Sequence, residues 1–171
     1  MSGHAQQPLS YADLLSVTKE IDFSDSLELR NNPEEVAALD SNIVKQWFGA
    51  VLPVNAVNKF KNRVFSLAGK ITTPENFDLL ILLEEKTKSD SSTTQILYLI
   101  SVKKNGEYIA SLKAAVNGTK KKTGYNITSC LYKGYKIVQD SKFTVDNKAY
   151  NDVALYKINS GGRFVSYPRT E

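Results

Sequence analysis

The feature that most constrains this fold is a succession of short apolar and aromatic runs, which begins at about residue 62 and continues almost to the end of the chain. The runs are rich in β-branched, aromatic and leucine residues, which favour strands, and turn-forming residues separate them. None of the connections is long enough to hold a crossover helix, so the pattern predicts an antiparallel meander. We expect eight strands, at residues 63–72, 77–86, 95–103, 107–116, 125–132, 135–145, 150–158 and 163–167.

The residues between these runs support the meander. Asn105-Gly106 stands between two apolar runs, and an Asn-Gly pair suits the tight type I′ turn of a hairpin. Further turn signals follow at Lys133-Gly134, Asp146-Asn147 and Ser160-Gly161-Gly162.

Two of the runs, at 79–83 and 96–100, are apolar at successive positions. Side chains alternate between the two faces of a strand, so this pattern predicts central strands that are covered on both sides. We expect N-terminal helices to cover one face and a folded-over second layer to cover the other. The fold class predicted is α+β, with about eight antiparallel strands in a sandwich or a strongly curved sheet.

The N-terminal third predicts two helices. Ser10 and Asp13 have the spacing of a capping box, which predicts a short helix at residues 11–18. Asn32-Pro33 resembles the start of a second helix, and Gly49 and Pro53 its end. The apolar stripe of that helix would consist of Val36, Leu39, Ile43 and Trp47.

A chain of 171 residues with 42% hydrophobic content is suited to one sizeable core. We therefore expect a single globular domain at 9–171, with a helical segment at 9–53 and a β-rich core at 62–167. Residues 1–8 are expected to be a disordered leader, or residues added for expression. No run approaches the roughly 20 apolar residues that span a bilayer.

Few side chains offer catalytic chemistry. His4 is the one histidine and Cys130 the one cysteine, so a Ser-His-Asp triad inside the fold, an internal disulfide and a thiolate metal cluster are not expected. Adjacent Glu84 and Glu85 would point to opposite faces of a strand. We expect no enzyme, no cofactor and no metal. A carboxylate-dependent enzyme stays open as the least favoured alternative, and it would need two acids that converge in a cleft.

Charge is distributed unevenly along the chain. Residues 1–101 hold 9 basic and 13 acidic side chains (net −4), whereas residues 102–171 hold 13 and 5 (net +8). The basic half could attract an acidic protein, a nucleic acid or an anionic membrane, and tyrosines could form a surface patch or pack at the edge of the core. We expect a protein partner rather than a nucleic acid. The candidate partner-binding residues are Lys120, Lys121, Lys122, Tyr125, Tyr132 and Tyr135.

Three segments, at 77–83 (FDLLILL), 105–112 (NGEYIASL) and 155–164 (LYKINSGGRF), resemble in texture the small β-rich envelope proteins, often lipid-anchored, of Bacteroidetes-type bacteria. The resemblance covers about residues 60–167 and contains no active-site motif. It implies a periplasmic or envelope location and a lipid anchor in the native precursor. A cytoplasmic location stays open.

These observations predict a non-enzymatic protein-interaction domain, in its sharper form an immunity or inhibitor protein that blocks a partner. The alternative is an envelope protein that binds a small ligand or a carbohydrate. An apolar or tyrosine-lined concavity would favour that alternative, and a uniformly convex surface would argue against it.

Overall fold

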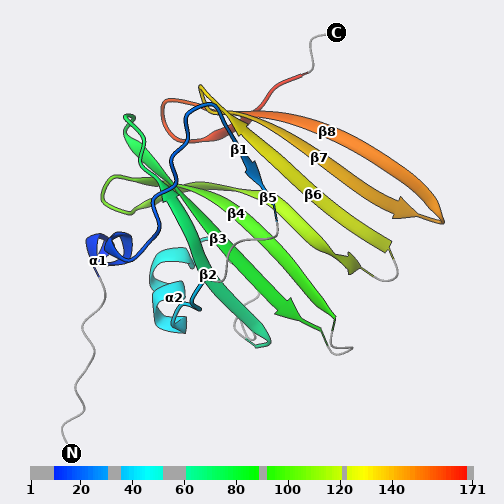
Figure 1. Ribbon diagram of the computed structural model, residues 1–171, viewed down its shortest axis with the longest axis horizontal. Helices are drawn as coiled ribbons and strands as arrows, with labels where there is room; N and C mark the ends of the chain where they lie inside the picture. Colours follow the sequence, from blue (N-terminus) through cyan, green and yellow to red (C-terminus); the bar gives the residue numbers. More distant parts are fainter. Residues whose placement is uncertain (1–9, 31–35, 52–60, 89–91, 121–122, 169–171) are drawn as a thin grey trace, which may run out of the picture.

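The computed structural model describes residues 10–30, 36–51, 61–88, 92–120 and 123–168. In these residues two short helices lie against one side of a single antiparallel sheet (Figure 1). Strands β2 to β9 pair in chain order and β1 pairs with β6, so the predicted meander is confirmed. The elements are α1 (Tyr11–Ser16), β1 (Ser26–Leu29), α2 (Ser41–Phe48), β2 (Arg63–Ile71), β3 (Phe77–Thr87), β4 (Thr93–Lys103), β5 (Tyr108–Lys120), β6 (Thr123–Tyr132), β7 (Lys136–Val145), β8 (Lys148–Ile158) and β9 (Phe164–Ser166).

Strand β5 divides the sheet into two halves. Its residues from Tyr108 to Asn117 pair with β4, but it pairs with β6 only from Val116 onward. Beside the rest of β6, strand β1 takes the place that β5 leaves, with Leu27 opposite Leu131. We call β2–β4 with the start of β5 the first half-sheet, and β1 with β6–β9 the second half-sheet.

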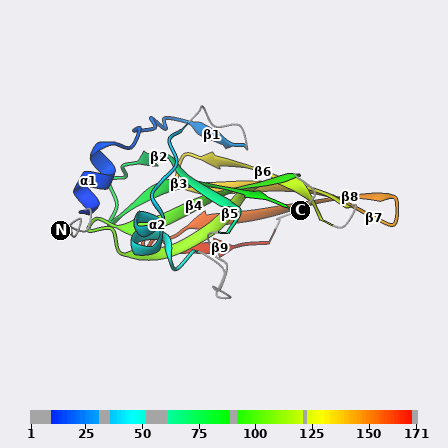
Figure 2. The ribbon, with the colours of Figure 1, turned by 90° about the horizontal axis from the view of Figure 1, so that it is seen from below.

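Two apolar cores lie on opposite faces of the first half-sheet. Leu79, Ile81 and Leu83 belong to the inter-sheet core, together with residues of β1, β6, β7 and β8. Leu80 and Leu82 point the other way, into the helix-side core under α1 and α2. Figure 2 shows β1 and α2 on opposite sides of these strands. The expectation that β3 and β4 are covered on both faces is therefore confirmed.

Buried side chains satisfy the backbone of β5 where it is separated from β6. A register shift against β4 leaves Ala114 as an extra residue, and neither Lys113 nor Ala114 pairs with β6. Gln139 Nε2 donates to the Lys113 carbonyl at 2.8 Å, and Ser129 Oγ donates to the Ala114 carbonyl at 2.6 Å. These bonds connect the two half-sheets across the inter-sheet core.

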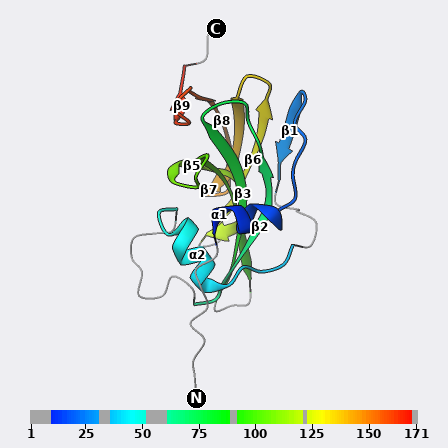
Figure 3. The same cartoon turned by 90° about the vertical axis from the view of Figure 1, so that its left-hand side faces the viewer.

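The first helix agrees with its prediction. Ser10 Oγ accepts from the Asp13 amide at 3.1 Å, and Asp13 accepts from the Ser10 amide at 3.2 Å, which is the expected capping box. The helix ends at Ser16, two residues earlier than expected. Both helices lie at the same end of the molecule, away from β9 (Figure 3).

The predicted start of the second helix is wrong. Helix α2 begins at Ser41, with Asp40 as its N-cap, and it ends before Gly49 as expected. Residues 31–35 lie outside the described residues. Val36 and Leu39 precede the helix, because the exposed backbone edge of β2 offers partners there: the Leu39 amide donates to the Phe65 carbonyl at 2.7 Å. A tertiary contact overrides local helix propensity in this segment.

The hairpin at Asn105-Gly106 is confirmed, but its turn type differs from the prediction. Only Gly106 has a positive φ, of 90°, and its amide donates to the Lys103 carbonyl at 2.8 Å. This is the pattern of a type I turn followed by a glycine bulge. The two-residue turn with both φ values positive occurs instead at Asp146 (48°) and Asn147 (61°).

Replacing Gly106 by alanine tests how strongly the helices dock on this hairpin. A Cβ atom there would lie 2.5 Å from Tyr11 Cγ and 3.0 Å from Trp47 Cζ3, in addition to the cost of the positive φ. Gly134, with φ 77° and open space around its Cβ position, is the matched control. We expect Gly134→Ala to lower the free energy of unfolding by about 1–2 kcal/mol and Gly106→Ala to lower it more. Urea unfolding followed by Trp47 fluorescence measures both, and equal losses would contradict this packing.

Candidate functional site

The structure does not bring the predicted partner-binding residues together. Tyr125 and Tyr132 lie at opposite ends of β6, and their separation of seven residues corresponds to about 23 Å along a strand. Lys121 and Lys122 lie outside the described residues, as does the side chain of Lys120. Partner binding by these residues stays a prediction.

Tyr135 has a packing role. Its ring meets the ring of Phe77 edge-on, with centroids 5.5 Å apart, and it packs against the inter-sheet core. Tyr132 is 42% exposed, and a hydrogen bond with Cys130 contributes most to the rise of its pKa. Of the three candidate tyrosines, Tyr125 and Tyr132 are thus surface residues and Tyr135 belongs to the edge of a core.

The buried acids are paired with cations. Glu84, in the helix-side core, accepts from the Tyr98 hydroxyl at 2.8 Å and lies 3.0 Å from Arg63 Nη1. Burial, followed by the charge of Glu84, raises the pKa of Tyr98 above its ordinary value. Asp78 accepts from Lys104 Nζ at 2.6 Å.

Glu84 and Asp78 do not form a pair with each other. They are six residues apart along β3, which corresponds to about 20 Å. Within the described ranges, no three His, Cys, Asp or Glu side chains gather in a way that could hold a metal ion.

A cavity of about 870 Å³ lies between β1 and β2. Its floor consists of side chains from the inter-sheet core: Leu29 of β1, Ile81 of β3 and Leu97 of β4 are each less than 5% exposed. Ala68 of β2 and Leu27 of β1 form part of its walls. The cavity is thus an opening into the core along one side of the curved sheet.

The rim of this cavity consists of two segments, residues 17–22 and 36–39. Backbone hydrogen bonds attach both segments to β2. The Ile21 amide donates to the Lys70 carbonyl at 2.8 Å, and the Lys70 amide donates to the Lys19 carbonyl at 2.9 Å. Gly69 permits this contact, because a Cβ atom there would lie 2.4 Å from Ile21 Cδ1. The glycine in the strand interior therefore marks a close approach of two chain segments.

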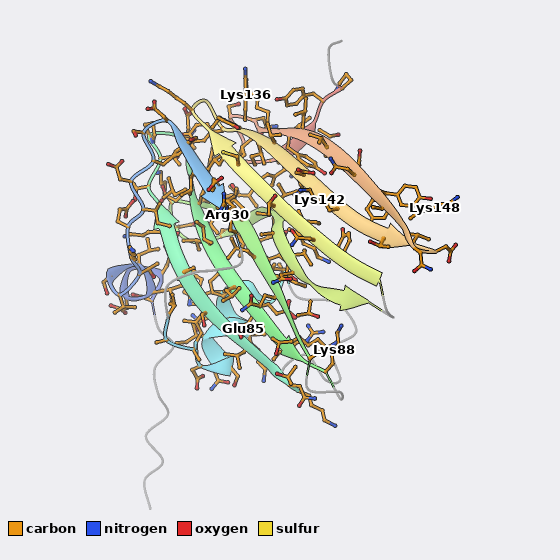
Figure 4. The ribbon with its side chains drawn as sticks, turned by 45° about the vertical axis from the view of Figure 1, so that its right-hand side comes forward. Arg30, Glu85, Lys88, Lys136, Lys142 and Lys148 are labelled. Atoms are coloured by element: carbon orange, nitrogen blue, oxygen red, sulfur yellow. The ribbon has the colours of Figure 1, made fainter. Side chains whose placement is uncertain are left out.

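The mouth of the cavity is charged, although its floor is apolar. Lys19 and Arg30 contribute two positive charges, and Glu20, Asp22 and Glu28 contribute three negative charges. Arg30, labelled at the end of β1 in Figure 4, pairs with Glu28 at 2.5 Å on the surface. An apolar interior with a polar mouth is the usual form of a small-molecule site.

Sequence reasoning missed this cavity and the strand that borders it. Strand β1 has four residues and falls in a segment that looked acidic, around Asp22, Asp25 and Glu28. The alternation of Leu27 and Leu29 around Glu28 was the available signal for a strand. Gly69 was the available signal for a close approach to β2.

Comparison with protein-family models, with curated proteins and with solved structures found no match. Neither α1 nor α2, the helices of the described part of the chain, has the length and apolar character needed to cross a membrane.

The carboxylate of Glu20 makes the attachment of the rim sensitive to pH. It accepts from the Thr72 amide at 2.9 Å and lies 3.4 Å from Lys70 Nζ. Burial acts to raise the pKa of Glu20, but the hydrogen bonds from Thr72 and Lys70 outweigh it, and the pKa is lowered. This contact therefore stabilises the folded rim above the ordinary glutamate pKa, and the stabilisation is lost as the pH falls through the lower, folded value.

We expect the amide resonance of Thr72 to titrate in NMR spectra with a midpoint below the ordinary glutamate value of about 4.3. The Glu20→Gln variant should lose this titration, whereas Asp22→Asn should retain it. A midpoint at or above the ordinary value in the unmodified protein would show that the contact does not hold the rim.

Proposed function

We propose that the protein is a non-enzymatic binding domain that takes up a small molecule with a largely apolar body in the cavity between β1 and β2. The observation that carries this proposal is the cavity itself, with a volume of about 870 Å³. Ligand sites in proteins commonly measure about 300–1,000 Å³ and have mostly apolar walls. The cavity falls within that range and is open along its charged mouth.

The free energy of binding would come from the apolar floor. Protein interiors are normally close-packed. The residues that line an apolar cavity therefore lack van der Waals contacts that a bound ligand can supply. Removing apolar surface from water contributes about 25 cal/mol per Å². Because Leu29, Ile81 and Leu97 are each less than 5% exposed already, this contribution would come mainly from the ligand's own apolar surface, which is removed from water when the ligand enters the cavity.

The charged mouth indicates the shape of the ligand. Side chains of both signs surround the opening, with Lys19 and Arg30 facing three carboxylates. A fully apolar molecule would leave its outer end beside these charges. The arrangement therefore favours an elongated molecule with an apolar body and a polar end.

Among the described residues the protein-partner hypothesis has less support, because Tyr125 and Tyr132 lie at opposite ends of β6 and Tyr135 packs at the edge of the inter-sheet core. It stays a prediction, as does the location in a bacterial envelope. We rank small-ligand binding above it, because an apolar concavity was the feature expected to distinguish the two.

Filling the cavity tests the proposal. We expect the neutral dye N-phenyl-1-naphthylamine to gain fluorescence on binding, and we expect Ala68→Phe, which places a ring in the wall of the cavity, to raise the dissociation constant at least tenfold. Ala12→Phe, at an exposed position of α1 outside the lining of the cavity, is the matched control and should bind like the unmodified protein. Circular dichroism verifies that both variants fold. An absence of dye binding, or equal binding by both variants, would refute the proposal.

A further inference from the structure

One face of the second half-sheet is not covered by any described residue. Leu131, Ile137 and Tyr156 point into the inter-sheet core, so the residues that alternate with them along β6, β7 and β8 point away from it. Within the described ranges, neither apolar core includes any of these outward side chains, and both helices pack on the first half-sheet. We call the outward surface of β6–β9 the outer face.

Two lysines stand side by side on the outer face. Lys136 of β7 lies directly opposite Lys157 of β8, and both side chains are exposed. Among the described residues, no ion pair involves either lysine. Like charges directly opposite each other in a sheet destabilise it. An anion bound over this pair would remove the repulsion, so the pair favours an anionic partner.

Exposed apolar side chains flank the lysine pair on both sides. Tyr132 of β6 lies opposite Lys136 and is 42% exposed. Val165 of β9 lies opposite Lys157 and is 49% exposed. The row that crosses these four strands therefore has two cations at its centre and an apolar group at each end.

The next row of the outer face carries no charge on β6, β7 and β8. Cys130 of β6 lies opposite Val138 of β7, which lies opposite Leu155 of β8, and all three side chains are partly exposed. The lysine pair thus stands beside a stripe of apolar groups that no described segment covers.

The charge of the outer face is positive. Lys142 lies farther along β7 on the same side of the strand as Lys136 (Figure 4). Asp140 is the one acid at the outward positions of β6–β9 among the described residues, where three lysines are present. On the neighbouring strand β1, Glu28 and Arg30 pair with each other.

We propose that the outer face docks on the surface of an anionic lipid bilayer. Anionic headgroups attract lysines that lie near them, and tyrosine side chains are enriched at the level of the headgroups. Apolar side chains such as Val165 can enter the boundary between headgroups and acyl chains. This site is separate from the cavity between β1 and β2 and does not depend on its function.

Other anionic partners fit this face less well. Lysine is depleted in protein–protein interfaces, whereas Lys136 and Lys157 stand at the centre of the row. A nucleic acid gains most of its affinity from cations that follow its phosphates. The apolar stripe beside the lysines would lie against those phosphates without a favourable contact.

Cosedimentation of the full chain with lipid vesicles tests this inference. At low ionic strength we expect binding to vesicles of equal parts phosphatidylglycerol and phosphatidylcholine, and no binding to phosphatidylcholine alone. The Lys136→Gln/Lys157→Gln variant should lower the partition coefficient at least tenfold. Lys86→Gln/Lys113→Gln is the matched control, because it removes the same charge from exposed lysines of β3 and β5. It should bind like the unmodified protein.

A second variant tests whether side chains enter the headgroup region. Tyr132→Ser/Val165→Ser keeps every charge of the protein, so a purely long-range attraction would leave its binding unchanged. We expect it to lower the partition coefficient at least threefold. Circular dichroism verifies that all variants fold.

The inference would be overturned by equal binding to the two kinds of vesicle, by no binding to either, or by equal losses in the two lysine variants. Unchanged binding of Tyr132→Ser/Val165→Ser would also overturn it. Oligothymidine and poly-L-glutamate represent the other anionic partners, and tighter binding to either of them than to the anionic vesicles would contradict the preference for lipid. Ala68→Phe should abolish dye binding in the cavity and leave vesicle binding intact, so failure of one site does not imply failure of the other.

Discussion

The structure depends on the hydrogen bonds that the backbone carbonyls of β5 accept where this strand passes from one half of the sheet to the other. A buried carbonyl without a partner costs about 1–3 kcal/mol, and β5 has two, at Lys113 and Ala114, that its neighbouring strand β6 does not reach. Ser129 and Gln139, both almost fully buried, donate to them. These bonds allow β5 to diverge from β6. Because the strands diverge, the two half-sheets can face each other across one core. The divergence also leaves part of the edge of β6 free to pair with β1.

Local chemistry was sufficient to predict strands β2 to β9, but not β1. Alternating or continuous apolar runs between turn residues gave boundaries that agree with the structure to within a few residues, and the two-sided character of β3 and β4 followed from consecutive leucines and isoleucines. The predicted start of the second helix was wrong because a segment distant in sequence offers hydrogen-bond partners to the backbone. Val36 to Leu39 resembles the first turns of a helix, yet the edge of β2 holds Leu39 in an extended conformation. The Asn105-Gly106 turn differs for another reason: the Lys103 amide donates to the Glu107 carbonyl, so the loop has three residues and takes a type I turn with a glycine bulge.

The candidate sites were harder to predict than the fold. The residues that line the cavity between β1 and β2 come from segments far apart in the sequence, such as Leu27, Ala68 and Leu97. No short sequence motif predicts such a combination. The number of tyrosines indicated that some of their rings would be exposed. Only the strand register determines which aromatic side chains lie next to each other. Register aligns Tyr125 with Phe143 and Tyr150, whereas it places Tyr132 at the far end of the same strand.

The segments that line the cavity mouth also protect the sheet. Strand β2 is the first strand of the meander, and its outer edge would present unpaired amides and carbonyls to other chains if residues 19–21 and 38–39 did not bond to it. Any event that lifts these segments would therefore open the cavity and uncover a template for intermolecular pairing at the same time. The backbone contacts that border the cavity are thus the same contacts that keep the edge of β2 from pairing with another chain.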